Sequence, residues 1–177
     1  IRYPRGKGLG VKLSKKPKML EVGKSETIRA GKDIAIYAVG RFVDIGLKTA
    51  DRLRGKGYNA TVINARFIKP VDEHLIEELS ETHKLIVIME DNSVIGGFGD
   101  AVLEVLAKKG ILINTLNLGI PDNFITHGAV KDLFNEIGLT EESMADKIER
   151  KAEELGINKY IRNKNNHLSD KKVDSIK

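Results

Sequence analysis

The stretch Ile34-Ala35-Ile36-Tyr37-Ala38-Val39-Gly40 decides the fold of this chain. Its first six residues are apolar without a break and include β-branched and aromatic side chains. Such a run is typical of a parallel strand that is buried on both faces of a sheet. Gly40 ends the run, and residues 42–56 carry apolar side chains at roughly helical spacing. A buried strand followed by a helix is therefore predicted here.

The same alternation of strand and helix continues along the chain. Apolar runs predict further strands at 60–63, 85–89 and 111–118. Apolar residues at helical spacing predict four further helices. One begins at 70–72, one follows the glycine-rich stretch 96–99, and the last two span 130–137 and 141–155. Asp72 is the expected N-cap of the first of these helices. Because such alternation produces parallel strands, the sequence predicts an α/β fold, a three-layer αβα domain whose mostly parallel sheet has about five strands.

Length and composition narrow the class of protein. The chain has 177 residues, of which 41% are hydrophobic, so it can bury one sizeable core and a single domain is predicted. It has no cysteine, which excludes disulfides and a cysteine nucleophile and fits a reducing compartment, so we expect a cytoplasmic protein. No run of about 18 apolar residues occurs, and no membrane partner is expected.

The net charge of +5 is divided unevenly along the chain. Residues 1–24 carry eight basic residues against one acidic residue, and residues 157–177 carry six against two. Residues 25–156 are acidic, with 16 basic residues against 22 acidic ones. We expect 1–24 to be the end of a preceding domain and a basic linker, 25–156 the α/β domain, and 157–177 a disordered basic tail. Nucleic-acid binding is not expected, because it needs basic charge organised on a folded face.

The first residues predict that the chain is part of a longer protein. Ile1-Arg2-Tyr3-Pro4-Arg5-Gly6 has the character of a strand end leaving a sheet, and that sheet would have to be formed by residues before Ile1. We therefore expect a fragment or an excised domain, whose chemistry depends partly on residues outside it.

Arg66 is the strongest candidate for a residue that binds a ligand. It follows a predicted buried strand, and loops after the carboxyl ends of parallel strands are where α/β sheets bind ligands. An arginine fork there can bind a phosphate or carboxylate through two hydrogen bonds. It can also pair with a nearby carboxylate such as Asp72 or Glu90. Spacing alone favours neither interpretation.

Two further loops at this edge carry polar residues. Glu90 and Asp91 precede the glycine-rich stretch 96–99. Two adjacent acids form a weak set for Mg²⁺, so a solvated or subunit-facing turn is favoured over a metal site. His127 can act as an acid, a base or a hydrogen-bond donor, but a structural role is favoured because no serine, cysteine or metal-ligand set accompanies it. The residues alone therefore give no complete catalytic constellation.

Four motifs taken together are more specific than any one of them. They are Arg2-Tyr3-Pro4-Arg5-Gly6, Asn64-Ala65-Arg66-Phe67-Ile68-Lys69-Pro70-Val71-Asp72, Glu90-Asp91-Asn92 with Gly96-Gly97-Phe98-Gly99, and Gly119-Ile120-Pro121-Asp122-Asn123-Phe124-Ile125. In order and spacing they resemble the C-terminal part, roughly the last quarter, of the 1-deoxy-D-xylulose-5-phosphate synthases, members of the transketolase superfamily. The resemblance runs from Ile1 to about Leu155.

The resemblance implies a transferase that uses thiamine diphosphate and Mg²⁺ to condense pyruvate with glyceraldehyde 3-phosphate, with loss of CO₂, for isoprenoid, thiamine and pyridoxal biosynthesis. Family members are homodimers of three-domain chains, and the first two domains bind the cofactors. The family's two phosphate-binding arginines correspond to Arg2 and Arg66. The family's catalytic, cofactor-binding and metal-binding residues have no counterpart in this chain. The implied role is acceptor-phosphate binding and dimer contacts, in a chain that is inactive alone.

Two alternatives remain open. One is the C-terminal domain of a related enzyme, a transketolase subunit or the β chain of a 2-oxoacid dehydrogenase. The start of the chain and the run Asn64-Ala65-Arg66-Phe67 favour the synthase over these relatives. The other is a non-catalytic regulatory or assembly module that keeps the fold.

Overall fold

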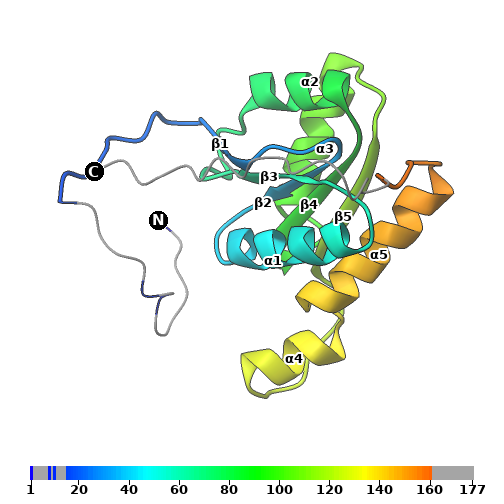
Figure 1. The fold of residues 1–177 in the computed structure, drawn as a ribbon. Helices are drawn as coiled ribbons and strands as arrows, with labels where there is room; N and C mark the ends of the chain where they lie inside the picture. The colour runs from blue at the N-terminus through cyan, green and yellow to red at the C-terminus, as the bar shows by residue number, and fades with distance from the viewer. Residues whose placement is uncertain (2–7, 9, 11–14, 161–177) are drawn as a thin grey trace.

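The structure is a computed structural model that describes residues 1, 8, 10 and 15–160. These residues form strands and helices that alternate from β2 to α4, after which a second helix, α5, follows (Figure 1). The elements are β1 (Glu26–Arg29), β2 (Asp33–Ala38), α1 (Phe42–Gly55), β3 (Thr61–Asn64), α2 (Glu73–Thr82), β4 (His83–Ser93), α3 (Phe98–Lys109), β5 (Asn114–Ile120), α4 (Val130–Glu136) and α5 (Glu141–Glu154).

The strands form one five-stranded sheet in the order β1-β3-β2-β4-β5. β2 is parallel to β3 and β4, and β4 is parallel to β5. β1 lies at the edge and runs antiparallel to β3. The predicted α/β fold with a mostly parallel sheet of about five strands is confirmed. The sequence did not predict β1, because its four residues are mostly exposed and form no apolar run.

Helices cover both faces of the sheet and produce the three layers (Figure 1). Successive side chains of a strand point to opposite faces. Ile34 and Ile36 of β2 therefore pack in one core cluster with buried residues of α1 and α5. Ala35 and Tyr37 pack in the other, with buried residues of α2 and α3. Since both faces of β2 are covered, its unbroken apolar run is explained.

Side-chain caps fix the starts of two helices. The predicted N-cap role of Asp72 is confirmed, since its carboxylate accepts a hydrogen bond from the Leu75 N–H at 3.3 Å. Thr140 caps α5 in the same way, accepting from the Ser143 N–H at 3.2 Å. Each bond satisfies an amide that has no partner inside its helix.

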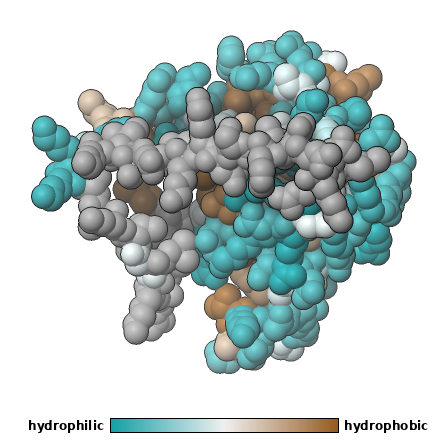
Figure 2. All heavy atoms as spheres, viewed as in Figure 1, coloured by the Kyte–Doolittle hydropathy of each residue, from teal (hydrophilic) through white to brown (hydrophobic). Residues whose placement is uncertain are grey.

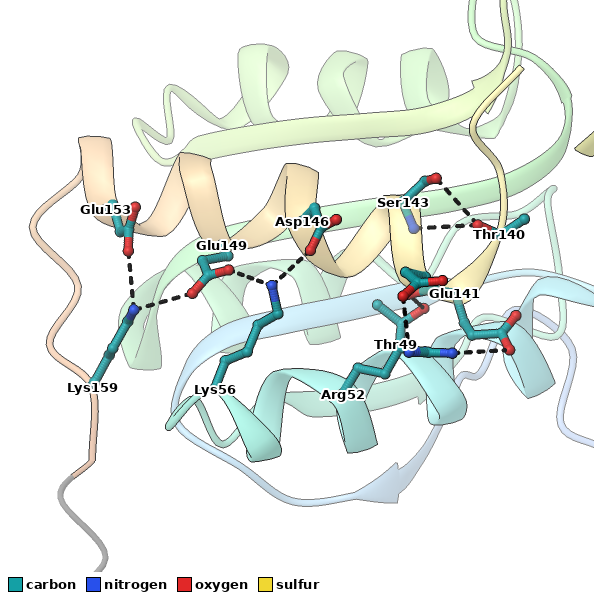
Figure 3. A network of polar contacts seen from close by, with 11 residues as sticks. Thr49, Arg52, Lys56, Thr140, Glu141, Ser143, Asp146, Glu149, Glu153 and Lys159 are labelled. Atoms are coloured by element: carbon teal, nitrogen blue, oxygen red, sulfur yellow. Dashed lines mark hydrogen bonds and ion pairs between the residues drawn. The ribbon is translucent and has the colours of Figure 1, made fainter. Parts of the chain in front are cut away.

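Ion pairs join α1 to α5 (Figure 3). Lys56, which follows α1, contacts Asp146 at 2.6 Å and also Glu149, both on α5. Lys159 reaches back to the same helix, with its ammonium 3.1 Å from Glu149 and 3.0 Å from Glu153. The Lys56 contacts thus join the end of α1 to α5, and the Lys159 contacts join the segment after α5 to the same helix.

Residues 157–160, the first four of the predicted tail, contact the domain. Ile157 is buried, the Tyr160 N–H donates to the Gly57 carbonyl at 2.6 Å, and the Tyr160 hydroxyl donates to the Asp33 carboxylate. The rest of the predicted tail lies outside the described residues, as do Arg2 and most of the predicted linker. The three domain boundaries stay a prediction.

The face drawn in Figure 2 is largely hydrophilic where described residues are visible. Figure 2 shows polar side chains over most of the face that grey atoms leave visible, with apolar atoms at its lower end, where Figure 1 places α4. α4 has no buried residue. No helix in the described part of the chain combines the length and apolar character needed to span a membrane.

Candidate functional site

The predicted site residues in the described part of the chain gather at one edge of the sheet. The loops after β2, β3, β4 and β5 all leave this carboxyl edge, because the four strands are parallel. Arg66 lies in the loop after β3, Glu90 and Asp91 in the last part of β4, and His127 in the loop after β5. This is the edge at which α/β sheets bind ligands.

Arg66 stands at the tip of a tight turn. Its φ of 57° lies in the left-handed region, which residues with a side chain rarely adopt. The Asn64 side-chain oxygen accepts from the Arg66 N–H at 3.0 Å, and the Phe67 N–H donates to the Ala65 carbonyl at 2.5 Å. These bonds hold a backbone conformation that costs about 1–3 kcal/mol, and such conformations cluster at binding sites.

The Arg66 side chain pairs with Glu26, the first residue of β1. Its Nη2 lies 2.5 Å from Glu26 Oε2, and the exposed fractions are 25% for Arg66 and 50% for Glu26. An ion pair is thus present, with Glu26 as the partner in place of the expected Asp72 or Glu90. The bond uses one of the five N–H donors of a guanidinium. The fork therefore keeps donors for an anion, and the phosphate role of Arg66 stays a prediction.

Asp72 has a different task, which is to anchor the start of β1. Its carboxylate accepts from the Ser25 N–H at 2.8 Å and lies 3.7 Å from the Lys24 ammonium. The Ser25 hydroxyl shares a hydrogen bond with the Tyr37 hydroxyl at 2.8 Å. Burial raises the pKa of Tyr37 to about 12, so this hydroxyl stays protonated at neutral pH. Together these contacts place Glu26, the next residue along the chain.

Glu90 is buried, at 2% exposure, so it does not lie in a solvated turn. Its two carboxylate oxygens accept from the N–H groups of Phe98 and Gly99 at 2.7 and 2.8 Å. A Cβ at Gly97 would collide with this carboxylate, which explains the glycine there. Glu90 therefore caps α3 from a neighbouring strand and fixes the glycine-rich loop.

Asp91 pairs with Arg41, a residue that the sequence analysis did not single out. Arg41 Nε lies 2.8 Å from Asp91 Oδ2, and the Arg41 guanidinium lies 5.6 Å from the centre of the Phe134 ring. The pair joins the loops after β2 and β4. The strand order changes direction here, because β3 lies on one side of β2 and β4 lies on the other. Its only sequence signal is the position of Arg41 directly after a strand and before a helix. The functional role of Asp91 stays a prediction.

The remaining questions at this edge are the role of His127 and whether the described residues could hold a metal ion. His127 is exposed in the loop between β5 and α4, and its role stays a prediction. Within the described ranges, no three His, Asp or Glu side chains come together in a way that could hold a metal ion. Anion binding by Arg66 stays a prediction.

The fold and its carboxyl edge define a doubly wound α/β domain with an arginine, Arg66, at the edge where such sheets bind ligands. More narrowly, the chain belongs to the transketolase C-terminal domain family, whose family model matches residues 23–144.

Named relatives agree with the predicted resemblance. The chain is 44% identical over 155 residues to the 1-deoxy-D-xylulose-5-phosphate synthase of Caldanaerobacter subterraneus, a match covering 88% of this chain and 25% of the relative. It is 41% identical to the synthase of Syntrophomonas wolfei, covering 88% and 24%. The chain therefore spans about a quarter of the length of the curated relatives it matches.

Solved structures agree on the fold. A structure described as a split gene transketolase, inactive beta4 tetramer, matches with a TM-score of 0.69 and 30% identity, over 74% of this chain and 43% of that one. A transketolase from Pichia stipitis matches with a TM-score of 0.58 and 19% identity, over 78% of this chain and 19% of that one, which supports the fold alone.

Proposed function

We propose that this chain acts as the C-terminal domain of a 1-deoxy-D-xylulose-5-phosphate synthase, in which Arg66 binds the phosphate of glyceraldehyde 3-phosphate. The complete enzyme condenses this aldehyde with pyruvate, releases CO₂, and acts in the cytoplasm as a homodimer in isoprenoid and thiamine biosynthesis. Thiamine diphosphate and Mg²⁺ are held by domains outside this chain. The identity of 44% to a named synthase supports the assignment.

One observation carries the phosphate role. Arg66 stands at the tip of a left-handed turn at the carboxyl edge, with its guanidinium paired through one nitrogen to the half-exposed Glu26. A planar fork with remaining donors matches the oxygen geometry of a phosphate. The strained turn is hard to explain by the ion pair alone, because an exposed pair contributes only about 0–1 kcal/mol.

The contribution of this chain to the reaction is to bind and orient the acceptor. Arg66 holds the phosphate end of the aldehyde, together with Arg2, which lies outside the described residues. A fixed phosphate restricts the position of the aldehyde carbon, and orientation of this kind lowers the entropic part of the barrier. Bond making and breaking belong to the cofactor-binding domains.

Exposed apolar side chains support the second part of the proposal, contacts within the dimer. Ile95 and Phe124 follow β4 and β5 at the carboxyl edge, and their exposed fractions are 65% and 107%. Val130 at the start of α4 is 50% exposed. Apolar groups gathered on one side of a domain are typical of surfaces that another domain or subunit covers.

The test uses the full-length enzyme that contains this chain. Arg66→Ala should raise the KM for glyceraldehyde 3-phosphate about ten- to hundredfold, because a charge-assisted contact is worth about 1.5–3 kcal/mol. The KM for pyruvate should change by less than about twofold, since that substrate has no phosphate. Arg54→Ala is the matched control, because Arg54 is exposed in the last turn of α1, toward the opposite edge of the sheet. Equal effects on both substrates would leave Arg66 a structural role only.

A second candidate is a separately encoded transketolase subunit. The match to the split gene transketolase favours it, because that structure carries this fold in a chain of which the match covers 43%. Sequencing the gene upstream of Ile1 distinguishes the two. Cofactor-binding domains in the same reading frame support the synthase, and a start codon directly before Ile1 supports the separate subunit.

A further inference from the structure

We infer that residues 157–160 form a strap that fixes the amino edge of the sheet and that the domain needs for its full stability. The amino edge is the one at which the parallel strands begin, opposite the carboxyl edge. The strap lies beyond residues 23–144, which the family model matches. The inference does not depend on the proposed function, because the candidate site lies at the other edge.

The end of α5 turns the chain into the strap. Gly156 has a φ of 64°, a left-handed conformation that glycine adopts at little steric cost. Its N–H donates to the Glu153 carbonyl at 3.0 Å, and the Ile157 N–H donates to the Ala152 carbonyl at 2.9 Å. These two bonds form a Schellman motif, in which the residue after the glycine packs back on the helix. Ile157 does so, since it is 4% exposed and belongs to the same core cluster as Ala152. The helix end therefore sets the direction of the strap.

Lys159 joins the strap to α5 and to the turn before β3 (Figure 3). Its ammonium pairs with Glu149 and Glu153 of α5, at 3.1 and 3.0 Å. The same ammonium lies 5.5 Å from the centre of the Tyr58 ring, and the Tyr58 side chain is buried. A Cβ at Gly57 would lie only 3.2 Å from the Lys159 Cβ. The strap therefore passes close to the backbone of this turn, where a side chain would crowd it.

Tyr160 ends the strap and bridges two starts of strands. Its N–H donates to the Gly57 carbonyl at 2.6 Å, in the turn before β3. Its hydroxyl donates to the carboxylate of Asp33, the first residue of β2, which is 127 residues away along the chain. The same carboxylate pairs with Lys84 of β4 at 3.2 Å. The Lys32 ammonium lies 5.8 Å from the centre of the Tyr160 ring. One residue of the strap thus connects the amino ends of β2, β3 and β4.

These contacts offset the cost of ordering a chain segment. Residues that follow a last helix gain freedom when they leave the domain, so a docked segment needs favourable contacts. The strap has a buried isoleucine, ion pairs to α5 and hydrogen bonds to two turns. Burial and the bond to Asp33 raise the pKa of Tyr160 to about 12, so its hydroxyl stays the donor at neutral pH. Loss of the Tyr160 contacts should therefore lower the stability of the domain.

The experiment measures thermal unfolding of the 177-residue chain by circular dichroism. Tyr160→Ala should lower the Tm by about 3–8 °C, because it removes a hydrogen bond to a charged group and the ring contacts. Tyr160→Phe keeps the ring and should lower the Tm by about 2–5 °C. Leu112→Ala is the matched control, since Leu112 is 99% exposed in the loop before β5 at the same edge. Its Tm should stay within about 1 °C of wild type.

A double-mutant cycle tests the contact between the strap and β2. Asp33→Gly removes the acceptor, and glycine adopts the φ of 59° that Asp33 has. Tyr160→Phe in that background should shift the Tm by less than about 1 °C. Amide hydrogen exchange gives a second readout, in which the Tyr160 N–H of the wild type should exchange at least about tenfold more slowly than in an unstructured peptide. The inference is overturned by an unchanged Tm in Tyr160→Ala, by an equal loss in Tyr160→Phe with and without Asp33, or by unprotected exchange at Tyr160.

Discussion

Glu90 offers a prediction whose size follows from the structure. Its buried carboxylate accepts from two amides at the start of α3, at 2.7 and 2.8 Å. Glu90→Ala leaves both N–H groups buried without this acceptor, and each such group costs about 1–3 kcal/mol. The free energy of unfolding should therefore fall by about 2–6 kcal/mol, a large part of the 5–15 kcal/mol that is typical of a domain.

The assay is urea unfolding of the chain, followed by far-UV circular dichroism. Glu90→Gln keeps one acceptor oxygen and should lose about half as much, which leaves a measurable variant if Glu90→Ala does not fold. Glu104→Ala, exposed on the same helix, is the control and should stay within about 0.5 kcal/mol of wild type. If Glu90→Ala also stayed within that range, the capping role of Glu90 would be refuted.

Two other predictions concern pH and the cofactor. Burial lowers the pKa of His83 below its ordinary value of 6.5, so protonation of His83 favours the unfolded chain. The stability that neutral His83 contributes is therefore complete above about pH 6.5. It is lost as the pH falls through the folded-state pKa. Unfolding free energies at pH 7.5 and 5.5 should differ less in His83→Asn than in wild type, and equal differences would contradict this prediction. Isothermal titration of the chain with thiamine diphosphate and Mg²⁺ should show no measurable binding, because the family's cofactor-binding motifs are not in its sequence, and micromolar binding would argue against the domain assignment.

The central strands and the helices beside them could be predicted from the sequence, because their signals are local. The apolar run 34–39 is unbroken, and its residues 34–38 are buried. Asp72 marks the start of α2 by its residue type and its position. The prediction of the last strand is less accurate, because β5 spans Asn114–Ile120 and the predicted strand spans 111–118. Ile111 and Ile113 are apolar because they pack against the core from outside the strand.

The partners at the candidate site could not be predicted, because they depend on the tertiary structure. Glu26 and Arg66 are 40 residues apart and meet only through the pairing of β1 with β3, a short exposed strand with no pattern of its own. Glu90 beside Asp91 has the appearance of a solvated acidic turn in sequence. Only the packing of α3 against β4 shows that its carboxylate is buried and satisfied by two amides.

The most direct test of the central claim compares two acceptors in the full-length enzyme. The wild type should prefer glyceraldehyde 3-phosphate to unphosphorylated glyceraldehyde, and Arg66→Ala should lose about ten- to hundredfold of that preference in kcat/KM while its rate with unphosphorylated glyceraldehyde stays unchanged. A variant that loses activity equally with both acceptors would contradict the account, since Arg66 would then stabilise the edge of the sheet without binding the phosphate.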